Sequence, residues 1–183
     1  VATTRGRGLP DDPDAFNADR SPKLNFSALT VSIPRDHATG EIEWPDTGPP
    51  DPAKNFITTE RDDIDSPGFL ARLRANARRG GAEAHTVNVF VHGYNNLYQE
   101  SVYRYAQIIH DGRLEGTNVL FAWPSRGKAQ LYLADRDGGQ DGVGRAVHHA
   151  HAVAVGVGDG GWGAGGVLRN RCAAANHGQR AGT

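Results

Sequence analysis

Two apolar runs separated by an amphipathic segment constrain the fold of this chain more than any other feature. Residues 86–91 are too continuously apolar for a sheet face open to water, which predicts a central strand. Residues 117–123 form a second run of the same kind, and the residues between them place Val102, Tyr105, Ala106 and Ile109 on one helical face before Asp111 and Gly112. Strand, helix and strand with short connections form a βαβ unit with a right-handed crossover, so the pattern predicts parallel strands and an α/β fold.

The residues before this unit predict a smaller set of elements. Residues 26–33 alternate apolar and polar side chains and predict a strand that ends at Pro34. The proline-rich segment 34–54 leaves room only for a short edge strand at 41–44, and a further strand is expected at 55–59. Residues 66–79 predict a helix with Ser66 as N-cap and Pro67 as its first residue. The opening stretch to Lys23 has little periodicity and is expected to lie extended on the surface.

Composition divides the chain near Asp137. Of the 24 glycines, 13 follow Asp137, and this tail lacks Phe, Tyr, Ile, Lys, Glu, Ser and Pro. We therefore expect residues 1–137 to be the N-terminal part of one α/β domain, with 1–54 as lead-in and edge strands and 55–137 as the βαβ core. Residues 138–183 are expected to be disordered or the product of a shifted reading frame, since Gly, Ala, Arg and Val dominate translations of GC-rich DNA.

Net charge, cysteine content and the length of the apolar runs limit the classes of partner that this chain is expected to have. The formal net charge is −1 and the pI about 6.8, which gives no field for nucleic acid or a membrane surface and favours a small-molecule or protein partner. One cysteine excludes an internal disulfide, no apolar run is long enough to span a bilayer, and no cofactor is indicated. The chain begins at Val1 without a hydrophobic leader. Two locations stay open, the cytoplasm or, if a signal or lipoprotein segment lies upstream, the cell envelope; the oligomeric state is undetermined.

The turns that follow the two parallel strands are the expected functional edge. Ligands of open parallel sheets collect at the carboxyl ends of the strands, where His92–Asn96 and 124–127 both fall. Glycine at position 93 permits positive φ and lets the backbone approach a ligand closely, so that the following N–H groups can donate to an oxyanion. The alternative is a tight turn that needs glycine for its own geometry.

Several stretches of the chain resemble one family. VFVHGYNN, VYRYAQIIHD, VLFAWPSRG and YLADRD are similar to the bacterial α/β-hydrolase family of esterase/lipase-like proteins known as domain of unknown function 900. VATTRGR, FSALTVSIP and GEIEWP resemble that family's upstream segment, so the resemblance covers residues 1–137. It implies an incomplete α/β-hydrolase-type parallel sheet flanked by helices, and a serine hydrolase whose substrate is a small ester-like molecule.

The same resemblance implies roles for residues at the edge. Gly93, Tyr94 and Asn95 would form the oxyanion and substrate rim, with the Tyr94 N–H as donor. His92 would be structural, because the triad of this fold runs nucleophile, acid, histidine, and His92 comes first. The other residues implied to be structural at the rim are Trp123, Pro124, Arg126 and Gly127.

The rest of the triad is not identifiable. The family has a serine on an H-S-M-G-like elbow, and this chain has no serine after Ser125. Ser125 lies in the wrong turn for an elbow, and Cys172 lacks the small residue two positions before it, so neither is favoured as nucleophile. Two hypotheses follow: the complete protein is a serine hydrolase of which this chain holds the front half, or the chain is a non-catalytic fragment or pseudo-enzyme that at most binds a ligand.

Three further sets of residues each allow a functional and a non-functional interpretation. The tail histidines His148, His149, His151 and His177 offer imidazoles, but without a second pair of ligands at a fixed spacing adventitious metal binding is favoured over a built site. The glycine cluster at 156–166 lacks the strand and helix of a phosphate loop and is expected to be flexible coil. Asp135, Arg136 and Asp137 are expected to be a solvated charge run. The sequence therefore predicts no metal site.

Overall fold

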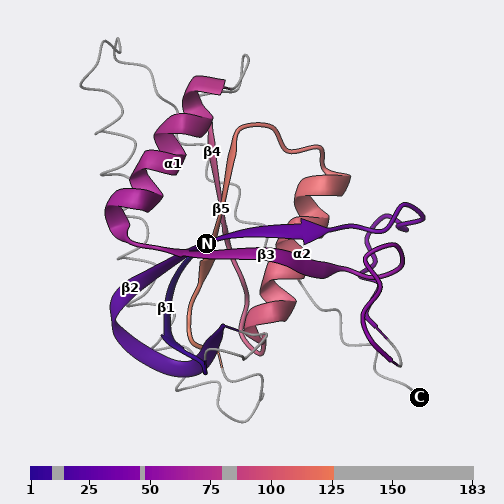
Figure 1. The fold of residues 1–183 in the computed structure, drawn as a ribbon, viewed down its shortest axis with the longest axis horizontal. Helices are drawn as coiled ribbons and strands as arrows, with labels where there is room; N and C mark the ends of the chain where they lie inside the picture. Colours follow the sequence, from indigo (N-terminus) through magenta and orange to yellow (C-terminus); the bar gives the residue numbers. More distant parts are fainter. Residues whose placement is uncertain (10–14, 46–47, 80–85, 126–183) are drawn as a thin grey trace, which may run out of the picture.

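A computed structural model describes residues 1–9, 15–45, 48–79 and 86–125 of the chain (Figure 1). These residues form a five-stranded sheet and two helices. The strands are β1 (Ala2–Arg7), β2 (Phe16–Ser32), β3 (Ile57–Ile64), β4 (Val87–Val91) and β5 (Thr117–Ala122), and the helices are α1 (Ser66–Arg79) and α2 (Tyr98–Asp111). The strand order across the sheet is β3-β2-β1-β5-β4.

The predicted βαβ unit is confirmed. β4 pairs with β5 in parallel, with Val87 opposite Thr117 and Val91 opposite Phe121, and α2 connects the two strands. On the other side of β5 lies β1, also parallel, with Ala2 opposite Phe121. β2 and β3 then add antiparallel strands. The result is a mixed sheet with a parallel core, flanked by helices, which is an incomplete α/β fold.

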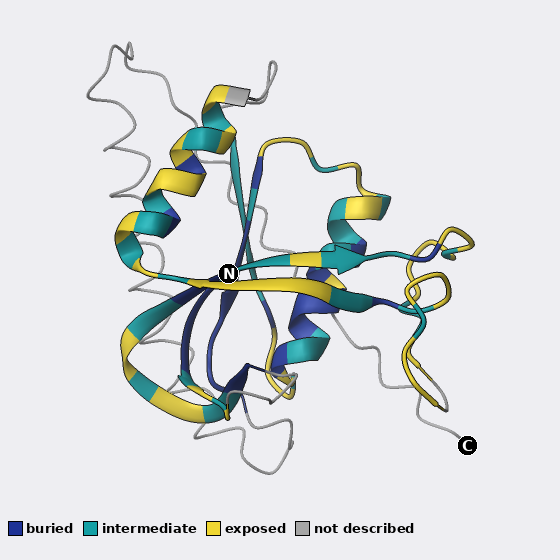
Figure 2. Cartoon of the chain, in the orientation of Figure 1, coloured by how far each residue is buried: buried dark blue, intermediate teal, exposed yellow. Residues whose placement is uncertain are grey.

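The core lies on both faces of β5 because its successive side chains alternate between the two helices. Val119, Phe121 and the following Trp123 pack in one cluster with Phe69 and Leu73 of α1. Leu120 and Ala122 belong to a second cluster, which holds Tyr98, Val102, Tyr103 and Tyr105 of α2. Figure 2 shows α1 exposed along much of its length and α2 mostly buried or half-buried, with β5 running between the two helices. Burial on both faces explains why β5 is so continuously apolar.

The structure corrects three predictions about strands. Residues 2–7 are not a surface lead-in: β1 lies between β2 and β5, and its residues 2–5 are buried. Residues 41–44 form no strand, although Glu43 O accepts a hydrogen bond from Phe56 N (2.9 Å). β4 was expected to be central, but among the described residues it is the edge strand beyond β5. In each case pairing between distant segments decided the outcome.

The helix ends follow local chemistry. α1 begins one residue earlier than the predicted cap implies, because Asp65 Oδ1 accepts the hydrogen bond from Gly68 N (2.8 Å) and Ser66 is already the first helical residue. α2 ends at Gly112 as predicted, where Gly112 N donates to Ile108 O and an added Cβ would lie 2.8 Å from that same oxygen. Neither described helix is long and apolar enough to cross a membrane.

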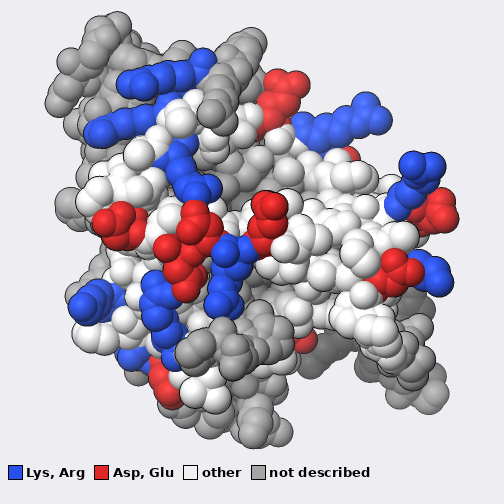
Figure 3. Space-filling model, in the orientation of Figure 1, with Lys and Arg blue, Asp and Glu red and all other residues white. Residues whose placement is uncertain are grey.

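Charges of both signs alternate on the face seen in Figure 3. β3 carries Glu60, Arg61, Asp62 and Asp63 in succession, all exposed or half-buried. Asp63 pairs with Arg7 (2.5 Å), and Asp62 pairs with Arg72 of α1. Exposed pairs of this kind contribute little stability, typically about 0–1 kcal/mol each.

Candidate active-site rim

Three parallel strands end at the same edge of the sheet. β4 is followed by His92 and β5 by Trp123, and the parallel registers place His92 level with Ala122 and Thr3, from which β1 continues to Arg5. We call residues 92–96 the rim loop and residues 123–125 the second turn. Hydrogen bonds between them show that the two turns predicted to share an edge are in contact.

His92 and Trp123 bind each other's backbone. Trp123 Nε1 donates to His92 O (2.8 Å), and His92 Nε2 lies 3.2 Å from Trp123 O. The two rings stack with centroids 5.1 Å apart and an interplanar angle of 7°. His92 Nδ1 lies 2.7 Å from Gly93 O, so both ring nitrogens face carbonyl oxygens. His92 is buried, and its described contacts hold the start of the rim loop against the second turn.

The rim loop turns its carbonyl groups toward its own interior. The Asn96 side-chain amide lies 3.2 Å from Gly93 O and 2.8 Å from Tyr94 O, and donates to both when its nitrogen faces them. In a trans peptide the C=O of one residue and the N–H of the next point in opposite directions. The Tyr94 and Asn95 N–H groups therefore point away from the interior of the loop, which is the orientation that an oxyanion donor requires.

Glycine at position 93 is not explained by backbone strain. Gly93 does not have a positive φ, so that part of the prediction is wrong; the left-handed residue of the loop is Asn95, with φ of 63°. Among the described residues, a Cβ added at position 93 would meet only Asn96 Oδ1, at 3.9 Å. The space beside Gly93 is thus open in the described part of the chain, and the Tyr94 side chain next to it is 55% exposed.

Ser125 joins the two turns from the inside. Its side chain is fully buried, its Oγ accepts a hydrogen bond from Asn96 N (3.2 Å), and its own N–H donates to Trp123 O (2.9 Å). A nucleophile has to reach the substrate carbonyl, and a serine with 0% exposure in this structure does not offer its Oγ to one. Pro124 beside it is also buried.

Arg5 supports the rim loop, and sequence reasoning missed it. This arginine is 1% exposed, and its Nη2 donates to Asn96 O (2.8 Å) at the end of the loop. Thr3 supports the neighbouring strand end: its Oγ1 donates to Ala122 O and accepts from Arg5 N (3.0 Å). The only signal in the sequence was the short run VATT before Arg5, which is compatible with a strand.

Tyr98 begins α2 directly behind the rim loop. Burial raises the pKa of its phenol to about 12, and its hydroxyl lies 3.4 Å from Ser27 Oγ. The ring also contacts Phe16, with centroids 5.1 Å apart. Tyr98 therefore stays protonated at physiological pH and serves as a packing residue rather than an acid or base.

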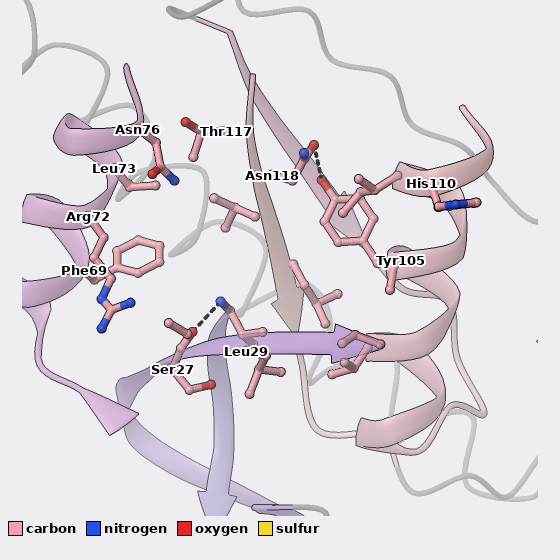
Figure 4. Close-up of a pocket in the computed structure, with 18 of the residues that line it drawn as sticks. Ser27, Leu29, Phe69, Arg72, Leu73, Asn76, Tyr105, His110, Thr117 and Asn118 are labelled. Carbon is pink, nitrogen blue, oxygen red and sulfur yellow. Dashed lines mark hydrogen bonds between the residues drawn. The ribbon is translucent and has the colours of Figure 1, made fainter. Parts of the chain in front are cut away.

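A large cavity lies at the opposite end of the sheet. It has a volume of about 690 Å³ and opens between α1, β5 and α2, with Leu29, Phe69, Leu73 and Asn118 in its lining (Figure 4). It lies beside residues 117–120 of β5, whereas the pairing of β5 with β1 is at Phe121 and Ala122. No residue of the rim loop lines it, so it is separate from the rim.

Several predicted residues fall outside the described ranges. They are Arg126 and Gly127 of the rim, the charge run at 135–137, Cys172, the glycine cluster at 156–166 and the four tail histidines.

Comparison with known proteins supports the resemblance over part of the chain. Residues 74–146 match the model of a family described as alpha/beta hydrolase of unknown function (DUF900). The match contains β4, the rim loop, α2, β5 and the second turn, and it continues past Asp137. No curated protein and no solved structure matches the chain. Residues 74–146, less than half of the chain, are thus similar to the α/β hydrolases of unknown function.

Proposed function

We propose that the complete family protein is a serine hydrolase acting on a small ester-like substrate, and that residues 92–96 of this chain form its oxyanion loop. In such an enzyme a serine attacks the carbonyl carbon, a histidine takes the serine proton, and backbone N–H groups stabilise the oxyanion. Of these parts, the described residues of this chain offer the N–H donors.

The orientation of the rim loop is the observation that carries this proposal. Asn96 and His92 engage the carbonyl side of the Gly93 and Tyr94 peptides, so that the N–H side of both faces outward. Within the described ranges, Gly93 leaves open space beside these groups, where a side chain would stand between them and a ligand. Arg5, Trp123 and Ser125 hold the loop from three directions, which pre-organises the donors before substrate arrives.

The second candidate function applies to the chain as it stands: a ligand-binding but non-catalytic protein. It is favoured by the burial of Ser125 and by the lack of any serine after it in the sequence. We therefore expect this chain to bind an anion that resembles the oxyanion without hydrolysing an ester.

One experiment separates binding from catalysis. Titration with butylphosphonate, followed by amide ¹H–¹⁵N spectra, should shift the signals of residues 93–95, and Gly93→Val should abolish those shifts by filling the open space. The control is inorganic phosphate, which lacks the acyl-like chain. Absence of shifts at the rim loop with intact dispersed spectra would contradict the oxyanion role.

Catalysis is tested on the same protein. The chain should release p-nitrophenol from p-nitrophenyl butyrate no faster than its Ser125→Ala variant does, and a fluorophosphonate probe should not label it. Labelling that disappears in Ser125→Ala would show that this serine is a nucleophile, and the non-catalytic reading would then be wrong.

A further inference from the structure

A second cluster of chemically active side chains lies at the far end of α2 from the rim. His37, in the proline-rich segment, is enclosed between two carboxylates, and its side chain is only 3% exposed. Its Nδ1 lies 2.9 Å from Glu43 Oε2, and its Nε2 lies 3.0 Å from Asp111 Oδ1 at the end of α2. The two ring nitrogens thus face different carboxylates.

His110 brings a second imidazole to the same carboxylate oxygen. Its Nδ1 lies 3.3 Å from Asp111 Oδ1, and the rings of His37 and His110 meet edge to face with centroids 5.3 Å apart. His37, His110 and Asp111 each contribute one potential ligand atom, and all three atoms lie within 4.8 Å of one another. Two imidazoles and one carboxylate are a set of ligands that zinc takes in proteins.

We propose that His37 Nε2, His110 Nδ1 and Asp111 Oδ1 form a binding site for a zinc-class divalent ion. Zinc holds nitrogen and carboxylate ligands at about 2.0–2.1 Å in a tetrahedron, which places neighbouring ligand atoms about 3.3 Å apart. The separations of 3.0 and 3.3 Å about Asp111 Oδ1 already meet this condition. Binding would require only that the two imidazoles move closer together. The His110 side chain can make this movement because 53% of it is exposed to solvent.

The surroundings of the three ligands match those of built metal sites. Ligating histidines commonly donate their other ring N–H to a carboxylate, which fixes the ring and its tautomer. Glu43 occupies that position on Nδ1 of His37, and Glu43 Oε1 is itself fixed by Ala38 N (3.0 Å). The other oxygen of Asp111 accepts from Gly40 N (2.7 Å) and Gln107 Nε2 (2.5 Å), so the carboxylate is oriented as well.

Charge favours a cation at this position. Glu43 and Asp111 bring two negative charges to one buried imidazole, whereas the nearby Arg104 directs its Nη1 to Gly40 O and Gln107 Oε1 instead of either carboxylate. A divalent ion in place of the His37 Nε2 proton would balance the negative charges of both carboxylates. The half-exposed His110, at 53%, gives solvent access to the fourth coordination position.

A metal ion here would join two segments that are distant in sequence. His37 belongs to the segment between β2 and β3, while His110 and Asp111 end α2. The ion would anchor this proline-rich segment to the helix at the end remote from the rim. The proposed role is therefore structural, and it is independent of the proposed hydrolase function.

The test measures zinc binding by calorimetry and cobalt(II) binding by its visible absorption spectrum. The tail histidines His148, His149, His151 and His177 would confuse the stoichiometry, so all four are replaced by glutamine in the reference protein. In this background one equivalent of zinc should bind, and cobalt(II) should give the intense absorption of a tetrahedral site. Because His110 is largely exposed, His110→Gln should keep the fold, as far-ultraviolet circular dichroism would verify, yet lose that equivalent.

Glu43→Gln provides the second, independent variant. It keeps all three ligands and removes only the charged partner of His37 Nδ1, so zinc affinity should fall about 10- to 100-fold without loss of stoichiometry. Trp44→Phe serves as the neutral control in the same segment. The proposal is wrong if the reference protein binds no zinc, or if it keeps its equivalent in His110→Gln.

Discussion

At the scale of single residues, the rim depends on side chains that bind backbone groups. His92, for which the family resemblance implies a structural role, is the clearest case. In the structure its nitrogens face the carbonyls of Gly93 and Trp123, and its own carbonyl accepts from Trp123 Nε1. The chemistry expected of this loop then comes from its peptide N–H groups, which the side chains orient.

Trp123→Phe should destabilise the chain by about 1–3 kcal/mol. The change removes the Trp123 Nε1 donor to His92 O, and loss of one partner of a buried hydrogen bond costs roughly that much. Urea unfolding followed by circular dichroism would measure it. Trp44→Phe, a change of the same chemistry on an exposed side chain, should cost less than about 0.5 kcal/mol. Equal losses for the two variants would contradict the proposed anchoring role.

Tyr98 predicts a loss of stability in alkali. Burial raises its pKa from 10.0 to about 12. Below pH 10 the phenol is therefore protonated in both the folded and the unfolded state, and its titration does not reduce the free energy of unfolding. Between pH 10 and 12 the unfolded state loses its proton first, and the free energy of unfolding should fall by about 1.4 kcal/mol per pH unit for this group. Burial also raises the pKa of Tyr105, which adds a loss of the same sign.

Tyr98→Phe should remove part of this alkaline loss, measured as urea midpoints from pH 8 to 12. Tyr94→Phe is the matched control, since the Tyr94 side chain is exposed, and it should leave the pH curve of the parent unchanged. A Tyr98→Phe curve parallel to that of the parent chain would show that burial of this phenol does not contribute.

At the scale of elements, the ends of helices and strands determine what reaches the rim. α2 starts directly behind the rim loop, where Glu100 Oε2 accepts from Leu97 N (2.7 Å). β1 carries Arg5 to the same edge from the other side of β5. The rim is thus assembled from three strand ends, of which the βαβ unit supplies only two.

Asp65→Ala tests the cap of α1. Asp65 Oδ1 satisfies the Gly68 N–H, and loss of an N-cap of this type costs about 0.5–2 kcal/mol. We expect Asp65→Ala to cost about 1 kcal/mol more in urea unfolding than Ser66→Ala, the cap that the sequence pattern favoured. Asp65→Asn, which keeps an acceptor oxygen, should restore most of the loss. If Ser66→Ala is the more costly change, Ser66 is the functional cap.

At the scale of the whole molecule, the described sheet ends at β4 and the composition changes soon after β5. The family match ends at residue 146, close to that change at Asp137. Because residues 138–146 still match the family, we propose that the reading frame shifts after them and that the rest of the tail, residues 147–183, results from this shift. The missing serine would then reflect the frame in which the gene is translated, and not the chemistry of the family.

Resequencing the gene and translating its other two frames beyond codon 137 would test this. We expect one frame to continue with an H-S-x-G elbow, followed downstream by an acid and a histidine in the order of the α/β-hydrolase triad. If neither frame contains an elbow, the tail is native sequence and the chain is better described as a non-catalytic relative.

The sequence predicted those parts of the fold that depend on residues close together in the chain. The helices at Ser66–Arg79 and Tyr98–Asp111, and the strands on either side of α2, follow from periodicities within a few turns of chain. The contact between the rim loop and the second turn followed from a topological rule for parallel strands. The edge strand expected at 41–44 failed because a proline-rich segment with apolar residues can pack without pairing in a sheet.

The sequence by itself determined the βαβ unit, its parallel pairing and the two turns at its carboxyl edge, because apolar periodicity and short connections are local properties. Only the tertiary structure decided that β1 lies inside the sheet, that Arg5 braces the rim loop, and that His37 meets His110 and Asp111. The contacts of Arg5 with Asn96 and of His37 with Asp111 join residues 91 and 74 positions apart, and β1 pairs with β5 from the other end of the described chain. Their partners are selected by burial and strand pairing across the whole fold, which no local pattern records.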